Sequence, residues 1–207
     1  MDKIEDQKRL NDNDIFQTSK KIKKDSKIVD VYILDTSGSM NDDNKYIAAL
    51  ESIKKDLNFD NTNNKLYSIT TFNNESIIHS KTLMNKQTLL EKLDTFDDCM
   101  GRTALYTAVA DTLEHIIEIM NKDSNIDPQL LIVKILTDGL NNVNDDDGIR
   151  ARSAVSKLTS LGSTITLLQA GDSSNAKDVL GIPEAATLNY NNKSNELTIA
   201  LDCARNA

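Results

Sequence analysis

The 207-residue sequence is poor in cysteine, glycine and proline, and it has no long apolar run. Its two cysteines, Cys99 and Cys203, lack zinc-ligand spacing, and two thiols do not make a disulfide framework. Seven glycines and two prolines exclude fibrous and low-complexity classes. No apolar stretch is long enough to cross a bilayer and no secretory signal is visible, so we expect a cytoplasmic protein.

Basic residues are also in the minority. The chain has 24 Lys and Arg against 32 Asp and Glu, a net charge of −8. Because an acidic surface repels phosphate groups, we expect neither nucleic acid nor a membrane as a partner. We assign residues 1–26, which are polar and carry a basic run, to a flexible charged N-terminal arm. Residues 27–207 are long enough for one folded domain with its own core.

From Lys27 onward, strand and helix patterns alternate. Ile28–Leu34 and Leu130–Leu136 are each interpreted as a continuous apolar strand that is buried on both faces. Further strands are predicted at 65–72, 75–83, 164–168 and 187–190, and helices at 46–57, 89–93, 105–120, 151–161, 175–180 and 194–204. Asn73-Asn74 predicts a tight turn, and hence an antiparallel pair. The pattern favours a three-layer α/β/α fold around a mostly parallel six-stranded sheet with one antiparallel edge strand.

Polar oxygen-bearing residues follow the two buried strands. Asp35-Thr36-Ser37-Gly38-Ser39 comes directly after the first, and Thr137-Asp138-Gly139 after the second. Ligands of doubly wound sheets bind at the carboxyl ends of strands where the strand order reverses, so these loops can share one rim. A third loop, Gly101–Leu105, opens the helix before the second strand and would bring Thr103 close. Hard oxygen ligands suit Mg²⁺ or Mn²⁺ better than zinc or iron.

In type and in order, these motifs resemble those of the von Willebrand factor A (VWA) family. The resemblance covers the sequence from about Lys27 to the C-terminus. The resemblance implies a Rossmann-like sheet with a metal-ion-dependent adhesion site (MIDAS). It assigns the five metal-binding positions to Asp35, Ser37, Ser39, Thr103 and Asp138. It also implies a bound Mg²⁺, with Mn²⁺ or Ca²⁺ as alternatives, and a protein partner that supplies an Asp or Glu to the metal.

The residue types explain why such a site would favour recognition. Hydroxyl ligands add no charge, and two carboxylates balance a dication only to neutrality, so the ion stays attractive to an anionic oxygen. Intracellular members of the VWA family commonly serve as adaptors beside AAA⁺ ATPases or in stress-response complexes. The resemblance therefore implies a role of this kind. Arg102 replaces a glycine that is common in the family. It would either help to capture a partner carboxylate or turn to solvent or to Asp97 and Asp98.

The rival hypothesis is a Mg²⁺-dependent phosphatase or phosphotransferase of the haloacid-dehalogenase type that uses Asp35. Such enzymes need a second Asp two residues later as general acid or base, and Ser37 occupies that position here. The sequence also lacks a phosphate-binding P-loop and a G-x-S-x-G motif. His79 and His115 are isolated and are interpreted as structural. We therefore predict a binding module rather than an enzyme.

Overall fold

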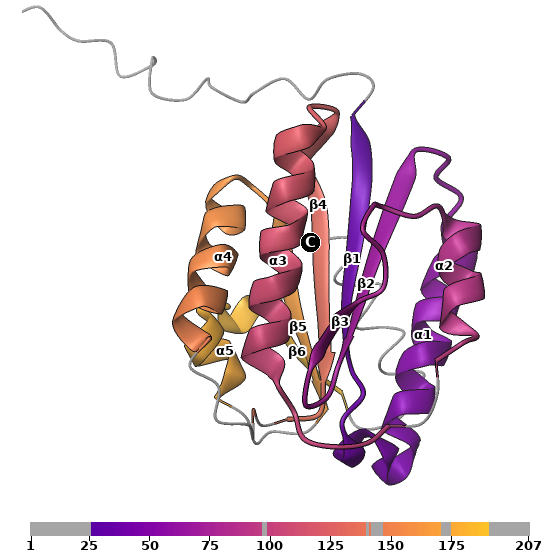
Figure 1. Cartoon of the computed structure of the whole chain (residues 1–207), viewed down its shortest axis with the longest axis vertical. Helices are drawn as coiled ribbons and strands as arrows, with labels where there is room; N and C mark the ends of the chain where they lie inside the picture. The colour runs from indigo at the N-terminus through magenta and orange to yellow at the C-terminus, as the bar shows by residue number, and fades with distance from the viewer. Residues whose placement is uncertain (1–25, 97–98, 140, 142–146, 171–174, 191–207) are drawn as a thin grey trace, which may run out of the picture.

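The computed structural model describes residues 26–96, 99–139, 141, 147–170 and 175–190, which form a sheet between two layers of helices (Figure 1). The strands, in spatial order, are β3 (Ser76–Ile78), β2 (Lys65–Phe72), β1 (Lys27–Asp35), β4 (Ile126–Thr137), β5 (Thr164–Ala170) and β6 (Thr187–Tyr190). The helices are α1 (Lys45–Phe59), α2 (Lys86–Leu93), α3 (Leu105–Lys122), α4 (Gly148–Ser160) and α5 (Ala176–Leu180), with 3₁₀ turns η2 (Gly38–Asn44) and η3 (Glu184–Ala186).

The strand order reverses at β1. The chain builds β2 and β3 on one side of β1 and β4, β5 and β6 on the other. Every neighbouring pair is parallel except β2 and β3. The predicted fold class is therefore confirmed, including its antiparallel edge strand. The carboxyl ends of β1 and β4 lie side by side at the point of reversal, where ligands of such sheets bind.

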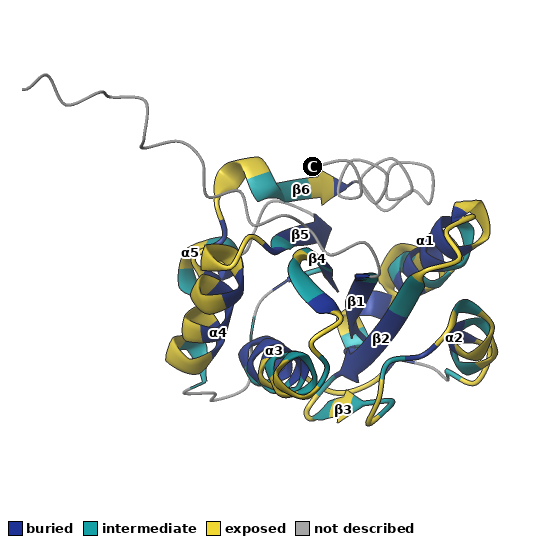
Figure 2. Ribbon diagram, turned by 90° about the horizontal axis from the view of Figure 1, so that it is seen from above, coloured by how far each residue is buried: buried dark blue, intermediate teal, exposed yellow. Residues whose placement is uncertain are grey.

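Both faces of the sheet are covered by helices. Helices α3, α4 and α5 lie on one face, and α1 and α2 lie on the other (Figure 2). Successive side chains of a strand point to opposite faces, so β1 contributes to both cores. Val31 and Ile33 pack in the core under α3, whereas Tyr32 and Leu34 pack in the core under α1. Burial on both faces anchors the carboxyl end of β1 from two sides.

Several predicted boundaries differ from the structure. The second buried strand begins at Ile126 instead of Leu130 and passes through Pro128. The register between β1 and β4 shifts there, and such an irregularity tolerates a residue that cannot donate a ladder hydrogen bond. The strand predicted at 75–83 is only Ser76–Ile78, and pairing with β2 resumes at an isolated bridge between Tyr67 and Met84. The predicted arm at 1–26, apart from Ser26, and the predicted helix at 194–204 lie outside the described residues.

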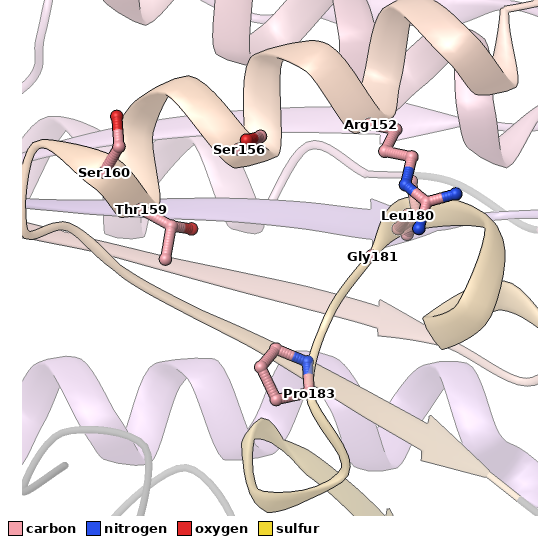
Figure 3. A pocket seen from close by; sticks show the side chains of 7 residues that line it. All are labelled: Arg152, Ser156, Thr159, Ser160, Leu180, Gly181 and Pro183. Atoms are coloured by element: carbon pink, nitrogen blue, oxygen red, sulfur yellow. The ribbon is translucent and has the colours of Figure 1, made fainter.

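Two cavities of about 460 Å³ each lie away from the carboxyl ends of β1 and β4. One lies between α4 and the segment that follows α5 (Figure 3), and its lining consists of Arg152, Ser156, Thr159, Ser160, Leu180, Gly181 and Pro183. The other lies beside the C-terminal half of α3, where Leu83, His115 and Ile126 contribute to its wall. Neither cavity is lined by a residue that the sequence predicts to bind metal. Among the described helices, none is both long and apolar enough to cross a bilayer.

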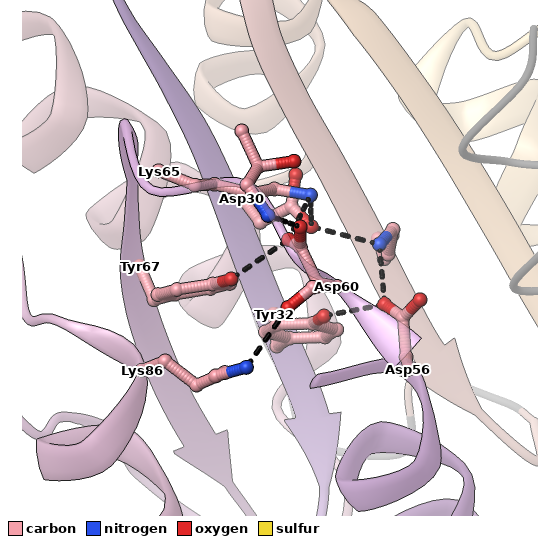
Figure 4. Close-up of polar contacts among 9 residues, drawn as sticks. Asp30, Tyr32, Asp56, Asp60, Lys65, Tyr67 and Lys86 are labelled. Carbon is pink, nitrogen blue, oxygen red and sulfur yellow. Dashed lines mark hydrogen bonds and ion pairs between the residues drawn. The ribbon is translucent and has the colours of Figure 1, made fainter. Parts of the chain in front are cut away.

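The prediction of continuous apolar strands is wrong at one position in each of the two central strands. Asp30 in β1 and Lys134 in β4 are both fully buried. Lys134 Nζ lies 3.0 Å from Asp30 Oδ2 and 2.8 Å from Asp56 Oδ2 of α1. Lys65 Nζ of β2 lies 2.9 Å from Asp30 Oδ2 and 3.0 Å from Asp60 Oδ2 (Figure 4). We call these five residues the interior ion cluster.

Two tyrosines donate hydrogen bonds to the interior ion cluster. The hydroxyl of Tyr32 donates to Asp56 Oδ2 at 2.6 Å, and that of Tyr67 donates to Asp60 Oδ2 at 2.8 Å (Figure 4). Buried charges are tolerated when they are paired and hydrogen-bonded, and each carboxylate of the cluster contacts a lysine. The charged residues inside the sheet therefore join β1, β2 and β4 to α1.

Candidate metal centre

Asp35 ends β1 with a fully buried side chain, and two hydrogen bonds fix it. The backbone N–H of Ser37 donates to Asp35 Oδ1 at 2.8 Å. Thr137 Oγ1, at the end of β4, donates to Asp35 Oδ2 at 2.6 Å. Its carboxylate is thus held both by its own loop and by the neighbouring strand, as expected for parallel strands that end at one rim.

Ser39 connects the first loop to the second. Its Oγ donates to Asp138 Oδ1 at 2.8 Å, and it lies 3.2 Å from Ser37 Oγ. Four of the five predicted metal-binding residues, Asp35, Ser37, Ser39 and Asp138, are therefore linked through hydrogen bonds within one small region.

The loop that carries Thr103 packs against the first loop. Gly38 N–H donates to Gly101 O at 3.0 Å, and Met100 N–H donates to Thr36 O at 3.0 Å. Thr103 is buried, two residues before α3 begins. The three loops that the sequence singles out thus meet at the carboxyl ends of β1 and β4, and we call this region the rim.

Burial raises the pKa of Asp35 to about 6, and the negative charge of Asp138 contributes to the rise. Hydrogen bonds from Ser37 and Thr137 oppose this shift without cancelling it. In the described part of the chain, no lysine or arginine forms an ion pair with Asp35. A buried carboxylate without a counter-cation is costly, and a bound dication would remove that cost.

Lys45, the first residue of α1, also contacts the rim, and no motif in the sequence indicates this contact. Its Nζ lies 2.8 Å from Asp138 Oδ2 and donates to Ser39 O at 3.4 Å. Asp43 and Asn44, just before it, have positive φ angles of 54° and 58°. The left-handed backbone conformation of these two residues turns the chain at the start of α1. The position of Lys45 after this turn cannot be predicted from the spacing of residues in the sequence.

The donor set at the rim fits a hard divalent cation. Among the described residues, no cluster of three or more His, Cys, Asp or Glu side chains could hold a metal ion. A metal at the rim would instead use two carboxylates and neighbouring hydroxyls. Oxygen ligands of this kind suit Mg²⁺ or Mn²⁺ and are poor ligands for soft metals.

The structure also shows where Arg102, His79 and His115 lie. Arg102 is exposed, and its backbone N–H donates to Asn74 Oδ1 at 2.6 Å. Nε2 of His79 lies 2.6 Å from Thr71 Oγ1, and the imidazole packs on the ring of Phe96. Burial lowers the pKa of His79 to about 4, which keeps it neutral. His115 lies on α3 beside the second cavity.

Comparisons with solved structures identify the fold. The structure of proximal thread matrix protein 1 from the mussel byssus superposes with a TM-score of 0.66 at 17% identity, over 88% of this chain and 47% of that one. A von Willebrand factor type A structure from Catenulispora acidiphila gives a TM-score of 0.65 at 18% identity, over 87% and 42%. Manganese-loaded TRAP protein from Plasmodium vivax gives 0.57 at 16% identity, over 87% and 74%.

The present chain spans about half the length of the first of these structures. The mussel protein has also been solved with zinc in its MIDAS motif, at a TM-score of 0.66 and 18% identity. No protein-family model and no curated protein matches the sequence. At such low identities the structural matches establish the fold alone, and they agree with the strand order described above. The described residues therefore form a doubly wound, Rossmann-like fold of the VWA type.

Proposed function

We propose that this chain is a metal-dependent protein-interaction module whose bound cation captures an acidic residue of a partner. The observation that carries the proposal is the arrangement at the rim. Asp35, Ser37, Ser39 and Asp138 are joined by hydrogen bonds, and the buried Asp35 forms no ion pair with a lysine or arginine of the described residues. Mg²⁺ is the preferred cation, and Mn²⁺ or Ca²⁺ would suit the same oxygen donors.

Each predicted residue has a distinct task in this proposal. The hydroxyls of Ser37, Ser39 and Thr103 would be neutral ligands. Asp35 and Asp138 would supply the balancing negative charge, directly or through water. When bound, the dication supplies an electrophilic centre for a partner's Asp or Glu. The solved structures with zinc in the mussel protein and manganese in TRAP support a divalent metal in this fold.

The rim disfavours the haloacid-dehalogenase alternative. A phosphoryl acceptor must expose a carboxylate oxygen to substrate, whereas both oxygens of the fully buried Asp35 accept hydrogen bonds. The position two residues later is Ser37, which cannot serve as a carboxylic acid. We therefore propose a non-enzymatic role, as an intracellular adaptor or regulator beside an AAA⁺ ATPase or within a stress-response complex.

Replacing Asp138 tests the metal site. In Asp138→Ala we expect Mg²⁺ binding to be lost by calorimetry, because one of two balancing charges and the acceptor for Ser39 disappear. Circular dichroism should show the fold retained. Partner capture should depend on divalent metal and should fail for this variant. Wild-type Mg²⁺ affinity in Asp138→Ala would overturn the assignment, and capture that persists in EDTA would locate the partner on another surface.

A further inference from the structure

We propose that Lys45 is a tethered cation that competes with the divalent metal for Asp138 and so sets the metal affinity of the rim. This inference rests on the proposed function. The ion pair between Lys45 Nζ and Asp138 Oδ2 measures 2.8 Å. The two side chains are only 16% and 5% exposed. Since solvent screens such a pair far less than a surface ion pair, breaking it should have a measurable effect.

Both carboxylate oxygens of Asp138 are engaged. Oδ1 accepts from Ser39 Oγ, and Oδ2 accepts from Lys45 Nζ. The ammonium also reaches the carbonyl oxygen of Ser39 at 3.4 Å. Lys45 therefore contacts two of the residues assigned to the metal, and it supplies a positive charge to a carboxylate that a bound dication would also need.

The position of Lys45 is poorly explained by helix stability. It is the first residue of α1, where the helix dipole favours negative side chains, and a lysine there is unfavourable on that account. The residue before it, Asn44, has a left-handed conformation and makes no side-chain cap. The left-handed backbone conformations of Asp43 and Asn44 also have an energetic cost. The ion pair with Asp138 is one interaction that opposes these costs.

Helix α1 holds Lys45 in place. Tyr46, Ala49 and Ile53 are buried in the core between α1 and the sheet, so the helix start cannot drift from the rim. With a dication beside it, the ammonium would add a third positive charge to a site with two carboxylates. Metal binding and the Lys45–Asp138 pair therefore oppose each other, and weakening one strengthens the other by thermodynamic linkage.

The test measures Mg²⁺ and Mn²⁺ binding to the full chain by titration calorimetry. We expect Lys45→Met to bind Mg²⁺ about tenfold more tightly than wild type, within the usual range of coupling between two binding events. Lys45→Arg keeps the charge and should stay near wild type. The matched control is Lys54→Met on the same helix, because Lys54 pairs with exposed Asp94 far from the metal residues and should leave affinity unchanged.

Thermal unfolding provides a second measurement. In EDTA, Lys45→Met should unfold at a lower temperature than wild type, because Asp138 loses its counter-charge, and added Mg²⁺ should raise its melting temperature more than that of wild type. Lys45→Gln serves the same purpose if the methionine variant does not fold.

The outcomes separate the two proposals. If wild type binds Mg²⁺, Asp138→Ala does not, and Lys45→Met matches or falls below wild type, the competition is wrong and the metal site stands. If no variant binds a divalent metal, both proposals fail. If wild type binds too weakly to measure and Lys45→Met binds, the competition is supported.

Discussion

The interior ion cluster and the rim use the same strands and the same residue types in opposite ways. Asp30 and Asp35 both belong to β1. Inside the sheet, Asp30 shares its Oδ2 with Lys65 and Lys134, and three aspartates are matched by two lysines and two tyrosine hydroxyls. At the rim, Lys45 pairs with Asp138, whereas Asp35 has no ion pair among the described residues.

The electrostatics of the two regions differ accordingly. Burial opposes ionisation of Asp60, but hydrogen bonds from Thr62, Lys65 and Tyr67 outweigh it and hold its pKa below the ordinary range. Burial of Asp35 is not compensated in this way, and its pKa rises to about 6. Each interior aspartate thus contacts a lysine of the chain, whereas the carboxylate of Asp35 has no such partner among the described residues and is suited to an external cation.

The largest expected effect is in the interior. Lys134→Met keeps an unbranched side chain that is one atom shorter, but it leaves Asp30 and Asp56 with one counter-cation fewer. We expect a loss of about 3–5 kcal/mol in the free energy of unfolding, measured by urea denaturation, because one partner of a buried pair is removed. In Lys54→Met, which removes a partly exposed pair, the loss should be about 0–1 kcal/mol. Similar losses in both variants would contradict the description of the interior cluster.

The pH dependence of stability should reveal Asp35. A carboxyl whose pKa is raised on folding, here from 3.8 to about 6, stabilises the metal-free protein below pH 4. That contribution is lost as the pH rises from about 4 through 6. A shift of this size corresponds to about 3 kcal/mol as an upper estimate.

Asp35→Asn should remove this part of the pH profile, and saturating Mg²⁺ should suppress it in wild type. Urea denaturation at several pH values in EDTA and in Mg²⁺ checks both expectations. A wild-type profile that matches Asp35→Asn between pH 4 and 6 would show that the native carboxyl has an ordinary pKa.

The smallest effect tests the buried Thr103. Thr103→Val keeps the shape of the side chain and removes its hydroxyl. We expect Mg²⁺ affinity to fall by about tenfold, equivalent to about 1.4 kcal/mol, because a ligand or its immediate support is lost. Thr103→Ser should restore most of the affinity. Calorimetry on the three proteins decides the point, and unchanged affinity in the valine variant would remove Thr103 from the site.

The sequence predicted most elements because their patterns are local. Strands β2 and β6 have the predicted bounds, and α3 begins at Leu105, where its apolar spacing starts. Gly162 follows α4 with a φ of +96°, as expected for a helix end. Errors arose where pairing overrode a local signal. Pro128 did not stop β4, because a shift in register with β1 accommodates it.

The motifs of the candidate site could also be located from the sequence, because each follows a strand or opens a helix. Alternation of strands and helices then places the ends of β1 and β4 together, where Asp35, Ser37, Ser39 and Asp138 are joined. Their binding of metal stays a prediction, as does the inclusion of Thr103.

The amino-acid sequence by itself determined the layers of the fold, the antiparallel edge strand and the loops that form the rim, because hydrophobic periodicity and turn residues act over short distances. Only the tertiary structure decided which charges meet. Lys134 reaches Asp56 from 78 positions away, and Lys45 reaches Asp138 from 93. Such pairs depend on how α1 lies against the sheet, and a lysine in a strand or at a helix start carries no local sign of its partner.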